Sequence, residues 1–497
     1  METTPGPGGR GGTEDGGTSA PSVVRTAVRY GWAPLVALAA TMALGSGEVA
    51  SLSQAVNGIQ RTFHVSNTMV SLLPVSLSVV GVLGAIPFGF MADRRRRTFV
   101  LAAAMVAWTA CMGLNGLAWS FGILLVFRLG VGFAEASGSA AVSLMGDYFP
   151  VTKRAAAMGW YNSGALFGSL IGFVLGGVAV SLGGWRWAFW FWVPLGVIVS
   201  LFIASRTEPP RGVQDVEFEA ARAAAAAAID SPIIGTSEAV IAFAGRLPAP
   251  RRVGTLDYGS AGVNDVMREL FRIRSMWWAL LSLTVAQCMA QALSFWAIPF
   301  FERVDHMSPV KAGAFAGILL PATIAGVIGG GFLADRLARR GILNARIYVV
   351  VGGAALSAVA LPLGFASGNL LLTAILLLLG GCGITIPIAP SEALFNDVVV
   401  ANLRGRAASV RSMVRAVSSV GSLVVGVLAD HLGGSGVGHA AGLQHALIIF
   451  APICGVAGMA FVFSRRSYGH DLAFVCAETA RIQGEAGQAP EAVIDLR

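Results

Sequence analysis

Charged residues are scarce in this chain of 497 residues. Asp, Glu, Lys and Arg together make up 12% of it, about half of the roughly 25% that is usual in soluble domains. So few charges cannot cover the surface of several soluble domains, and a soluble fold is therefore excluded. Hydrophobic residues make up 55% of the chain and its mean hydropathy is +0.70, which also excludes an intrinsically disordered protein.

Cysteine is too sparse and too scattered to form a disulfide framework or a metal centre. The five cysteines show no C-x-x-C spacing and no pairing with histidines. They are Cys111, Cys288, Cys382, Cys454 and Cys476. The sequence also lacks a P-loop, an H-E-x-x-H zinc helix and a nucleophile elbow. We therefore expect no metal, no cofactor and no catalytic residues, and do not expect an enzyme.

The chain lacks the basic soluble face that would bind nucleic acid. Its net charge is +8, from 35 basic and 27 acidic residues, but these charges lie between apolar blocks. Basic loops beside apolar blocks are typical of membrane proteins, in which Lys and Arg collect on the cytoplasmic side. No cleavable signal peptide is visible, because residues 1–20 are rich in Gly and Thr and lack a basic start.

Long hydrophobic runs dominate the rest of the sequence. A bilayer core of about 30 Å requires roughly 20 apolar residues per helix, and this measure yields twelve candidate spans. They cover residues 33–56, 67–92, 98–118, 121–146, 155–182, 187–204, 276–301, 309–334, 347–366, 369–395, 407–431 and 444–464. The predicted fold class is therefore an all-α membrane protein with twelve transmembrane helices.

The distribution of Lys and Arg sets the orientation of these spans. If both termini are cytoplasmic, 28 of the 35 basic residues fall on the cytoplasmic side and three on the outer side, as the positive-inside rule requires. Arg outnumbers Lys by 33 to 2, which is typical of a GC-rich bacterial source. We therefore predict a multi-pass protein of the cell membrane, in a bacterium the inner membrane, with both termini in the cytoplasm.

The apolar blocks divide the chain into two halves. The predicted parts are a disordered cytoplasmic leader at 1–32, an N-terminal six-helix bundle at 33–204, a cytoplasmic linker at 205–275, a C-terminal six-helix bundle at 276–464 and a cytoplasmic tail at 465–497. The linker ends in a basic amphipathic stretch, residues 263–274, which predicts an interfacial helix. A calmodulin-type or partner-binding helix is the alternative.

One motif occurs once in each half. G-F-M-A-D-R-R-R-R follows the second span, and G-F-L-A-D-R-L-A-R-R follows the eighth. The motif residues are Gly89, Asp93, Arg94 and Arg97 in the first copy and Gly331, Asp335, Arg336 and Arg339 in the second. Parallel repeats of six helices are typical of transporters whose substrate path lies between the halves near the membrane midplane.

The motif G-x-x-x-D-R-x-x-R-[RK] between spans two and three resembles the signature loop of the major facilitator superfamily. Arg96 stands where that family usually has Gly, and Ala338 stands there in the second copy. The resemblance covers spans one to twelve and implies two pseudo-symmetric six-helix bundles that work by alternating access. It also implies that the loop acts in gating, because it latches the cytoplasmic ends together when the cavity opens outward. A basic loop that merely obeys the positive-inside rule is the alternative.

The fifth span carries four glycines at steps of four: Gly164, Gly168, Gly172 and Gly176. Glycines at this spacing lie along one helix face and let another helix approach closely. The spacing resembles the antiporter motif of drug/proton exporters in the same superfamily, although Phe173 replaces the proline of that motif. The resemblance favours export, and helix packing alone is the alternative.

Two further segments resemble the spinster branch of the superfamily. The first is Gly47-Glu48 with N-G-I-Q at 57–60, and the second is R-L-G-V-G-F-A-E-A-S at 128–137. Members of this branch export sphingolipids or lysophospholipids, or handle related amphipaths. Glu48 falls where these proteins carry an acidic residue, but Val49 replaces the arginine that follows it there.

Charged residues inside apolar blocks are costly, at roughly 3 kcal/mol or more each, and indicate function or pairing. Glu48 has no arginine beside it in the sequence, so it is the first candidate for proton coupling, and Glu135 is the second. A hydrogen-bonded structural role for Glu48 is the alternative. Arg128 lies on the same helix face as Glu135 but about 10 Å away, so each is expected to pair with another group or with substrate.

Arg404, Arg411 and Arg415 form a basic stripe along the eleventh span. We expect the stripe to face the central cavity or Glu392 of the tenth span, where guanidinium groups would suit an anionic head group. Arg415 lies deepest and is the first candidate for substrate contact. The other candidates for substrate binding are Arg128, Gln54, Gln287, Gln291 and Glu392.

These features together predict a secondary transporter that exports an amphipathic or lipid-like organic molecule and is driven by the proton gradient. We expect it to be monomeric and to contact its small-molecule or lipid substrate and the membrane lipid. Uptake of an organic anion through Arg128 and Arg415 is one alternative. A receptor or scaffold that does not transport, and that uses the linker at 206–274, is another.

Overall fold

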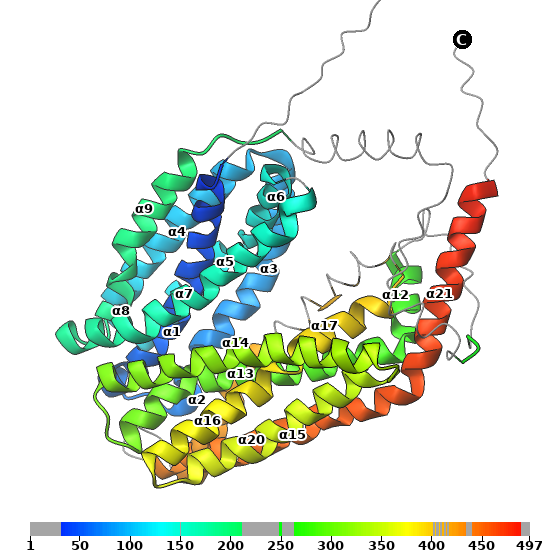
Figure 1. The fold of residues 1–497 in the computed structure, drawn as a ribbon. Helices are drawn as coiled ribbons and strands as arrows, with labels where there is room; N and C mark the ends of the chain where they lie inside the picture. The colour runs from blue at the N-terminus through cyan, green and yellow to red at the C-terminus, as the bar shows by residue number, and fades with distance from the viewer. Residues whose placement is uncertain are drawn as a thin grey trace, which may run out of the picture.

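The computed structural model describes residues 31–149, 151–210, 248–250, 263–400, 417–433 and 440–488, together with 403, 407, 410, 411 and 414. Within these ranges the chain is almost entirely helical (Figure 1). Eleven helices are long and apolar enough to cross a membrane, and a shorter apolar helix, Val417–Gly433, occupies the place of the eleventh predicted span. The predicted class, an all-α membrane protein, is confirmed. Residues 1–30 of the predicted leader and most of the predicted linker lie outside the described residues.

The first half contains six spans, of which the second, fourth and sixth are interrupted. Each of these three consists of two helices separated by a turn. In chain order the helices are α1 (Ala33–Phe63), α2 (Asn67–Val70), α3 (Leu72–Arg94), α4 (Arg97–Leu117), α5 (Phe121–Glu135), α6 (Gly138–Tyr148), α7 (Val151–Gly183), α8 (Trp187–Trp190) and α9 (Trp192–Ala204). The break in the fourth span leaves Glu135 as the last residue of α5.

The second half repeats the break in its fourth span, whereas its second span, α14, is one continuous helix. Its described helices are α12 (Val263–Arg272), α13 (Arg274–Arg303), α14 (Pro309–Arg339), α15 (Ala345–Ala366), α16 (Leu370–Thr385), α17 (Ile388–Asp397), η2 (Val417–Ser419), α19 (Val420–Gly433), α20 (Ala440–Met459), η3 (Ala460–Ser464) and α21 (Arg465–Gln488). The tenth span breaks between α16 and α17, as the fourth breaks between α5 and α6. The repeat is therefore visible in the helices as well as in the paired motif.

Equivalent ion pairs tie helices together in the two halves. Arg97, the first residue of α4, pairs with Asp147 near the end of α6 at 2.5 Å. Arg346, at the start of α15, pairs with Asp397 at the end of α17. In each half an arginine therefore joins the start of the third span to the end of the fourth, at the predicted cytoplasmic side.

The glycine row of the fifth span packs against α1. A Cβ atom at Gly164, Gly168 or Gly172 would lie 2.0–2.3 Å from a carbonyl oxygen of α1. This distance is shorter than any normal contact between two such atoms. The carbonyls belong to Ala39, Ala43 and Gly47, which repeat the same step of four. At Gly176 the Cβ would lie 2.8 Å from the Ser51 hydroxyl. Only residues without a side chain allow α7 to lie this close to α1.

The two halves meet at one end of the molecule and diverge toward the other (Figure 1). Helix α1 contacts α13, α7 contacts α14, and α2 contacts α19. The loops that follow α1 and α13 lie at this meeting end, which the charge distribution predicts to face outward. The halves diverge toward the end at which α12 and α21 lie, which is the predicted cytoplasmic end.

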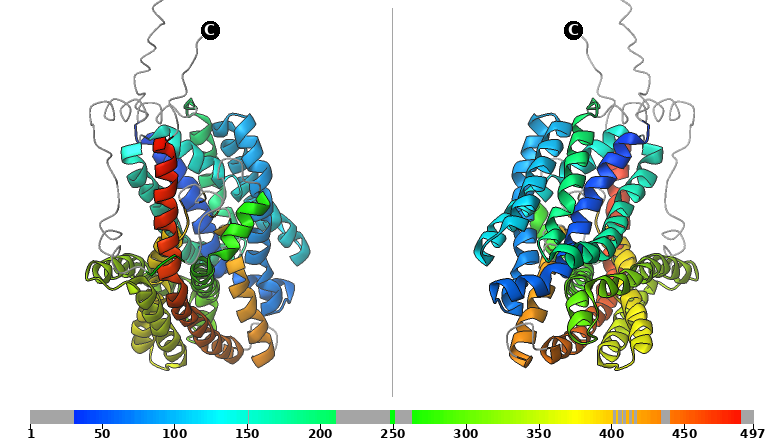
Figure 2. Two further views of the ribbon diagram at one scale, coloured as in Figure 1. Left: turned by 90° about the vertical axis from the view of Figure 1, so that its right-hand side faces the viewer. Right: turned by 90° about the vertical axis from the view of Figure 1, so that its left-hand side faces the viewer.

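The chain continues beyond the twelfth span as a helix, α21. The Asp471 carboxylate on α21 accepts hydrogen bonds from the backbone N–H of Ser275 at 3.1 Å and from its hydroxyl at 2.6 Å, at the start of α13. Tyr468 on the same helix donates to Asp397 at 3.2 Å. Helices α12 and α21 lie on the same side of the molecule (Figure 2). The first part of the predicted tail is therefore packed against the second half.

Candidate functional site

A pocket of about 410 Å³ lies where helices of both halves approach each other. Most of its lining comes from the first half, and α13 and α14 of the second half complete it. The lining residues are Thr41, Met42, Gly45, Ser46, Val49, Ala50, Leu77, Leu101, Met105, Trp108, Ala134, Glu135, Ser137, Gly138, Tyr161, Ser169, Phe173, Gln291, Ser294 and Leu320. Its size is in the range of pockets that hold drug-sized organic molecules.

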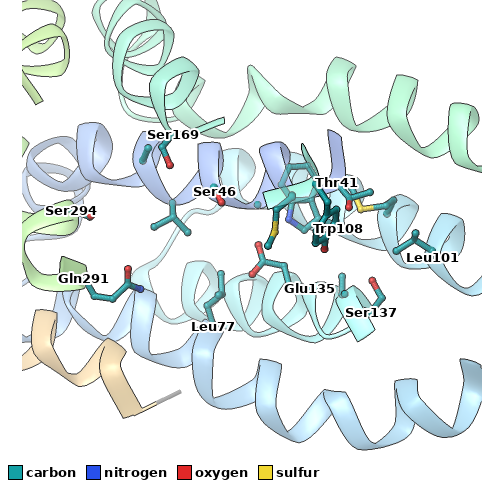
Figure 3. Close-up of a pocket in the computed structure, with 18 of the residues that line it drawn as sticks. Thr41, Ser46, Leu77, Leu101, Trp108, Glu135, Ser137, Ser169, Gln291 and Ser294 are labelled. Atoms are coloured by element: carbon teal, nitrogen blue, oxygen red, sulfur yellow. The ribbon is translucent and has the colours of Figure 1, made fainter. Parts of the chain in front are cut away.

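Glu135 is the one charged side chain among these described lining residues. Figure 3 shows its carboxyl pointing into the pocket, with Gln291 and Ser294 of the second half on the opposite side. The uncharged polar groups are hydroxyls, one indole and one amide, and the remaining lining is apolar. The pocket therefore combines an apolar body with a single acid, which suits an amphipathic ligand.

The break in the fourth span and a glycine on α1 make room for the Glu135 carboxyl. A Cβ atom at Gly45 would lie only 3.2 Å from Oε1 of Glu135, so a larger residue there would crowd the acid. Oε1 is buried and has no hydrogen-bond partner among the described residues. The indole of Trp108 is within hydrogen-bonding reach of the carboxyl. One oxygen of the acid is therefore left without a donor.

Glu48 and Arg128 form an ion pair between α1 and α5. Both side chains are fully buried, and neither lines the pocket. This corrects the expectation that Glu48 has no arginine beside it: Val49 offers none in the sequence, but the neighbouring helix supplies one. The Arg128 guanidinium also lies over the Phe189 ring, 6.0 Å from its centroid. The pair is neutral as a whole, as burial in a low-dielectric interior requires.

A polar network joins the two halves at the predicted outer end. Arg303 of α13 donates to Asn57 Oδ1 at 2.8 Å, to Asn67 Oδ1 at 2.9 Å and to Gln60 Oε1. Asn57 in turn donates to Glu302. The Arg303 side chain is buried, with 6% of its surface exposed. A buried arginine of the second half is thus held by three amide side chains of the first.

Asp430 of α19 forms a second junction at the same end. Its carboxylate accepts from the backbone N–H groups of Asn67 and Thr68 at 3.1 and 2.8 Å. It also accepts from the Asn67 amide at 2.8 Å and from the Thr68 hydroxyl at 2.6 Å. Asn67 therefore contacts both Arg303 and Asp430, and the two junctions form one network across the interface.

The structure places the predicted substrate-binding residues in different surroundings. Gln291 lines the pocket, whereas Gln287 is half-buried on the same helix and does not. Gln54 is buried and donates to the Phe173 carbonyl at 2.7 Å. Glu392 pairs with Arg411. This agrees with the expectation that the basic stripe faces Glu392. Arg404 and Arg415 lie outside the described residues.

The paired gating motif is only partly described. Arg94 is exposed, and Arg97 is buried between Asp147 and Glu208. In the second copy, Asp335, Arg336 and Arg339 are exposed at the end of α14. Gly89 belongs to α3, and the side chain of Asp93 lies outside the described part of the chain.

Sequence reasoning missed the aromatic and hydroxyl groups of the pocket. Trp108 and Tyr161 lie inside apolar spans, where hydropathy alone does not distinguish a core residue from a lining residue. Ser137 belongs to the segment that resembles the spinster branch, which was the one signal for it. The helix faces that meet at the pocket become known only from the packing of the spans.

The fold, two bundles of membrane-spanning helices with a pocket between them, is that of a secondary membrane transporter. The chain belongs to the Major Facilitator Superfamily, whose sequence profile matches residues 36–423. It is therefore a transporter and not an enzyme, and the reading as a scaffold that does not transport is set aside. The resemblance seen in the repeated loop motif is confirmed.

Individual relatives agree with this assignment. The chain is 24% identical over 307 residues to the uncharacterized transporter YybO of Bacillus subtilis. The aligned region covers 61% of this chain and 65% of that relative. Its fold is similar to that of a bacterial homologue of the human lysosomal transporter Spinster in an inward-facing, occupied conformation. That structure has a TM-score of 0.73 and 19% identity, and the match covers 90% of this chain and 99% of the other.

A second structure of a bacterial Spinster homologue, inward-facing and unoccupied, matches with a TM-score of 0.69 and 20% identity over 89% of this chain and 97% of that one. A D-xylose–proton symporter matches with a TM-score of 0.64 and 12% identity over 89% of this chain and 99% of that one. At these identities the matches show a shared fold.

Proposed function

We propose that this transporter exports an amphipathic or lipid-like organic molecule in exchange for protons. The observation that carries the proposal is the position of Glu135, which places a single carboxyl at a break in the fourth span, inside a largely apolar pocket between the halves. A carboxyl in such a place can take up and release a proton as its surroundings change between two conformations.

The transport cycle follows from the arrangement of the two halves. The polar network around Arg303 and Asp430 holds the predicted outer end closed, and the halves diverge toward the predicted cytoplasmic end. This arrangement supports substrate entry from the cytoplasm or the inner leaflet. Closure of the cytoplasmic end and opening of the outer end would then expose Glu135 to the outside. Protonation of Glu135 there would release the substrate and favour return of the transporter to the inward-facing conformation.

The organic-anion alternative receives less support from the pocket. Arg128, one of its two proposed anion ligands, is fully buried and paired with Glu48, and it does not line the pocket. The described lining residues offer an anion no basic side chain. An anion in this pocket would instead face the Glu135 carboxyl.

The proposal is tested in proteoliposomes with an imposed pH gradient. A thermal-shift screen against lysolipids, drugs and organic acids first identifies a substrate. We expect Glu135→Gln to abolish proton-driven transport of that substrate, because Gln keeps the shape of the side chain but cannot exchange a proton. We expect Glu48→Gln to reduce transport, because it leaves the Arg128 guanidinium buried without its counter-charge next to Glu135. Asp265→Asn, on the exposed surface of α12, is the matched control and should retain transport. Proton-driven transport by both glutamine variants at the control rate would contradict the proposal.

A further inference from the structure

When Glu135 is ionised, the described charged groups at the pocket, Glu48, Arg128 and Glu135, sum to one negative charge. Glu48 and Arg128 neutralise each other as a buried pair, which leaves the Glu135 carboxylate without a cation of its own. A lone carboxylate in a low-dielectric site is strongly disfavoured unless it takes up a proton or binds a positive group. The buried Oε1 of Glu135, which has no hydrogen-bond partner among the described residues, therefore favours a proton or a positive group.

The groups that surround Glu135 come from several helices, and the described ones supply no free cation. Glu48 of α1 and Arg128 of α5 are the charged neighbours. Helix α4 contributes Trp108, and α7 contributes Tyr161, a titratable but neutral phenol. From the second half, α13 and α14 contribute Gln291, Ser294 and Leu320, which are uncharged.

The walls of the pocket suit the body of an organic cation. Trp108, Tyr161 and Phe173 offer three aromatic side chains, and aromatic faces attract quaternary ammonium and similar cations. Leu77, Leu101 and Met105 add aliphatic surface. An apolar ligand with one positive group would satisfy both the aromatic wall and the acid, whereas an anionic head would meet repulsion from Glu135.

We propose that the substrate is an amphipathic monovalent cation whose positive group is held by the Glu135 carboxylate. This inference rests on the proposed function, because it assigns a substrate class to the same pocket and the same acid. A proton and the cation use the same carboxylate and exclude each other, so one cation leaves for each proton that enters.

The test compares two ions of the same shape and opposite charge. Purified full-length protein in phosphatidylcholine nanodiscs is titrated with tetraphenylphosphonium and with tetraphenylborate, and empty nanodiscs provide the blank. We expect specific binding of the phosphonium, and its loss as the pH is lowered and protons occupy Glu135. We expect no specific binding of the borate, since its charge has the same sign as that of the acid.

Two substitutions locate the site. Glu135→Gln should weaken phosphonium binding about tenfold or more, the usual scale for loss of a desolvated charge partner, and should remove its pH dependence. Glu135→Asp keeps the charge and should retain pH-dependent binding. Thermal unfolding of both variants checks that they are folded, and Asp265→Asn should bind like the wild type.

The outcomes separate this inference from the proposed function. If Glu135→Gln loses proton-driven transport but the wild type binds borate as tightly as phosphonium, the function stands and the cation inference falls. If Glu135→Gln keeps proton-driven transport but loses phosphonium binding, the cation site stands and the proposed coupling falls. Borate binding that Arg415→Gln removes would overturn the inference in favour of an anion site.

Discussion

The Glu48–Arg128 ion pair connects the first and fourth spans in the interior of the first half. Each side chain is fully buried, so either charge alone would face a low-dielectric interior without a counter-charge. The pair also lies near Glu135, whose ionisation it influences through both of its charges. Its neutrality is therefore a condition for Glu135 to act as the one exchangeable charge at the pocket.

Removal of one member of this pair should cost more stability than removal of both. We expect Arg128→Met to destabilise the protein by roughly 3–5 kcal/mol, because it leaves the Glu48 carboxylate buried and unpaired. The double variant Glu48→Gln/Arg128→Met should recover most of this loss. Thermal unfolding in one detergent measures both, and Arg206→Met, whose contacts lie within one helical turn, should change little. Additive losses in the double variant would contradict the pairing.

Sequence reasoning found the charged residues of the site but not all of their partners. Glu48, Arg128 and Glu135 stand out because ionisable groups inside apolar spans are rare. The partner of Glu48 lies 80 residues away on another helix, and sequence spacing carries no information about which helices become neighbours. The different positions of Gln54 and Gln291, one hydrogen-bonded to a carbonyl and one lining the pocket, depend on packing in the same way.

At the scale of helices, the contact between α1 and α7 should depend on the glycine row. Gly168→Ala would place a Cβ 2.0 Å from the Ala43 carbonyl oxygen, which forces the helices apart and should cost roughly 1–3 kcal/mol. Gly159→Ala on the same helix is the control, because a Cβ there meets nothing within 4 Å. It should be neutral or stabilise α7 by up to about 1 kcal/mol. Thermal unfolding that shows equal effects of the two substitutions would refute this packing.

The start of α4 depends on an acid from outside the helix. The N-cap residue of α4, Arg96, makes no side-chain hydrogen bond to the helix. Glu208 instead accepts hydrogen bonds from the backbone N–H groups of Arg97 and Thr98 at 2.8 and 3.2 Å. Burial alone would raise the pKa of Glu208, but these bonds and those from the Arg97 and Thr98 side chains lower the pKa below its ordinary value of 4.5. The carboxylate form is therefore the one that stabilises the folded protein.

This cap should make stability depend on pH. Because the folded-state pKa of Glu208 lies below the unfolded-state value, its contribution is present at neutral pH and is lost as the pH falls through the folded-state pKa. We expect Glu208→Gln to lower stability by about 1 kcal/mol at pH 7 and the difference from wild type to shrink in acid. Thermal unfolding between about pH 7 and pH 3, a range that extends below the unfolded-state pKa of Glu, measures this, with Asp265→Asn as control. A difference that does not vary with pH would contradict the cap.

The helices themselves were largely predictable because the length of a hydrophobic run directly reflects the thickness of the bilayer. The basic amphipathic stretch at 263–274 likewise predicted the helix α12. The breaks at Ser137 and Pro387 were not predicted, since each apolar run continues across the break. Helix α21 was missed because its sequence is polar, and its packing depends on partners such as Ser275 and Asp397 that are distant in sequence.

At the scale of the whole molecule, the network around Arg303 favours one of the two conformations that alternating access requires. The halves touch at the predicted outer end through Asn57, Gln60 and Asn67 on one side and Arg303 and Asp430 on the other. Opening of that end must break these hydrogen bonds and expose their groups to water. The equilibrium between the two conformations should therefore shift when one member is removed.

Arg303→Ala should move this equilibrium toward an open outer end. Hydrogen bonds to a charged group contribute about 1.5–3 kcal/mol each at most, and a shift of roughly 1.4 kcal/mol changes a two-state ratio tenfold. Spin labels at Met69 and Asp305, both exposed and on opposite halves, report the separation of that end once the native cysteines are replaced. We expect a longer label distance to gain population in Arg303→Ala.

Arg186→Ala is the matched control, because Arg186 contacts only Ala118 and Trp185 of its own half among the contacts the structure describes. An unchanged distance distribution in Arg303→Ala, or the same change in Arg186→Ala, would show that the network does not hold the outer end closed.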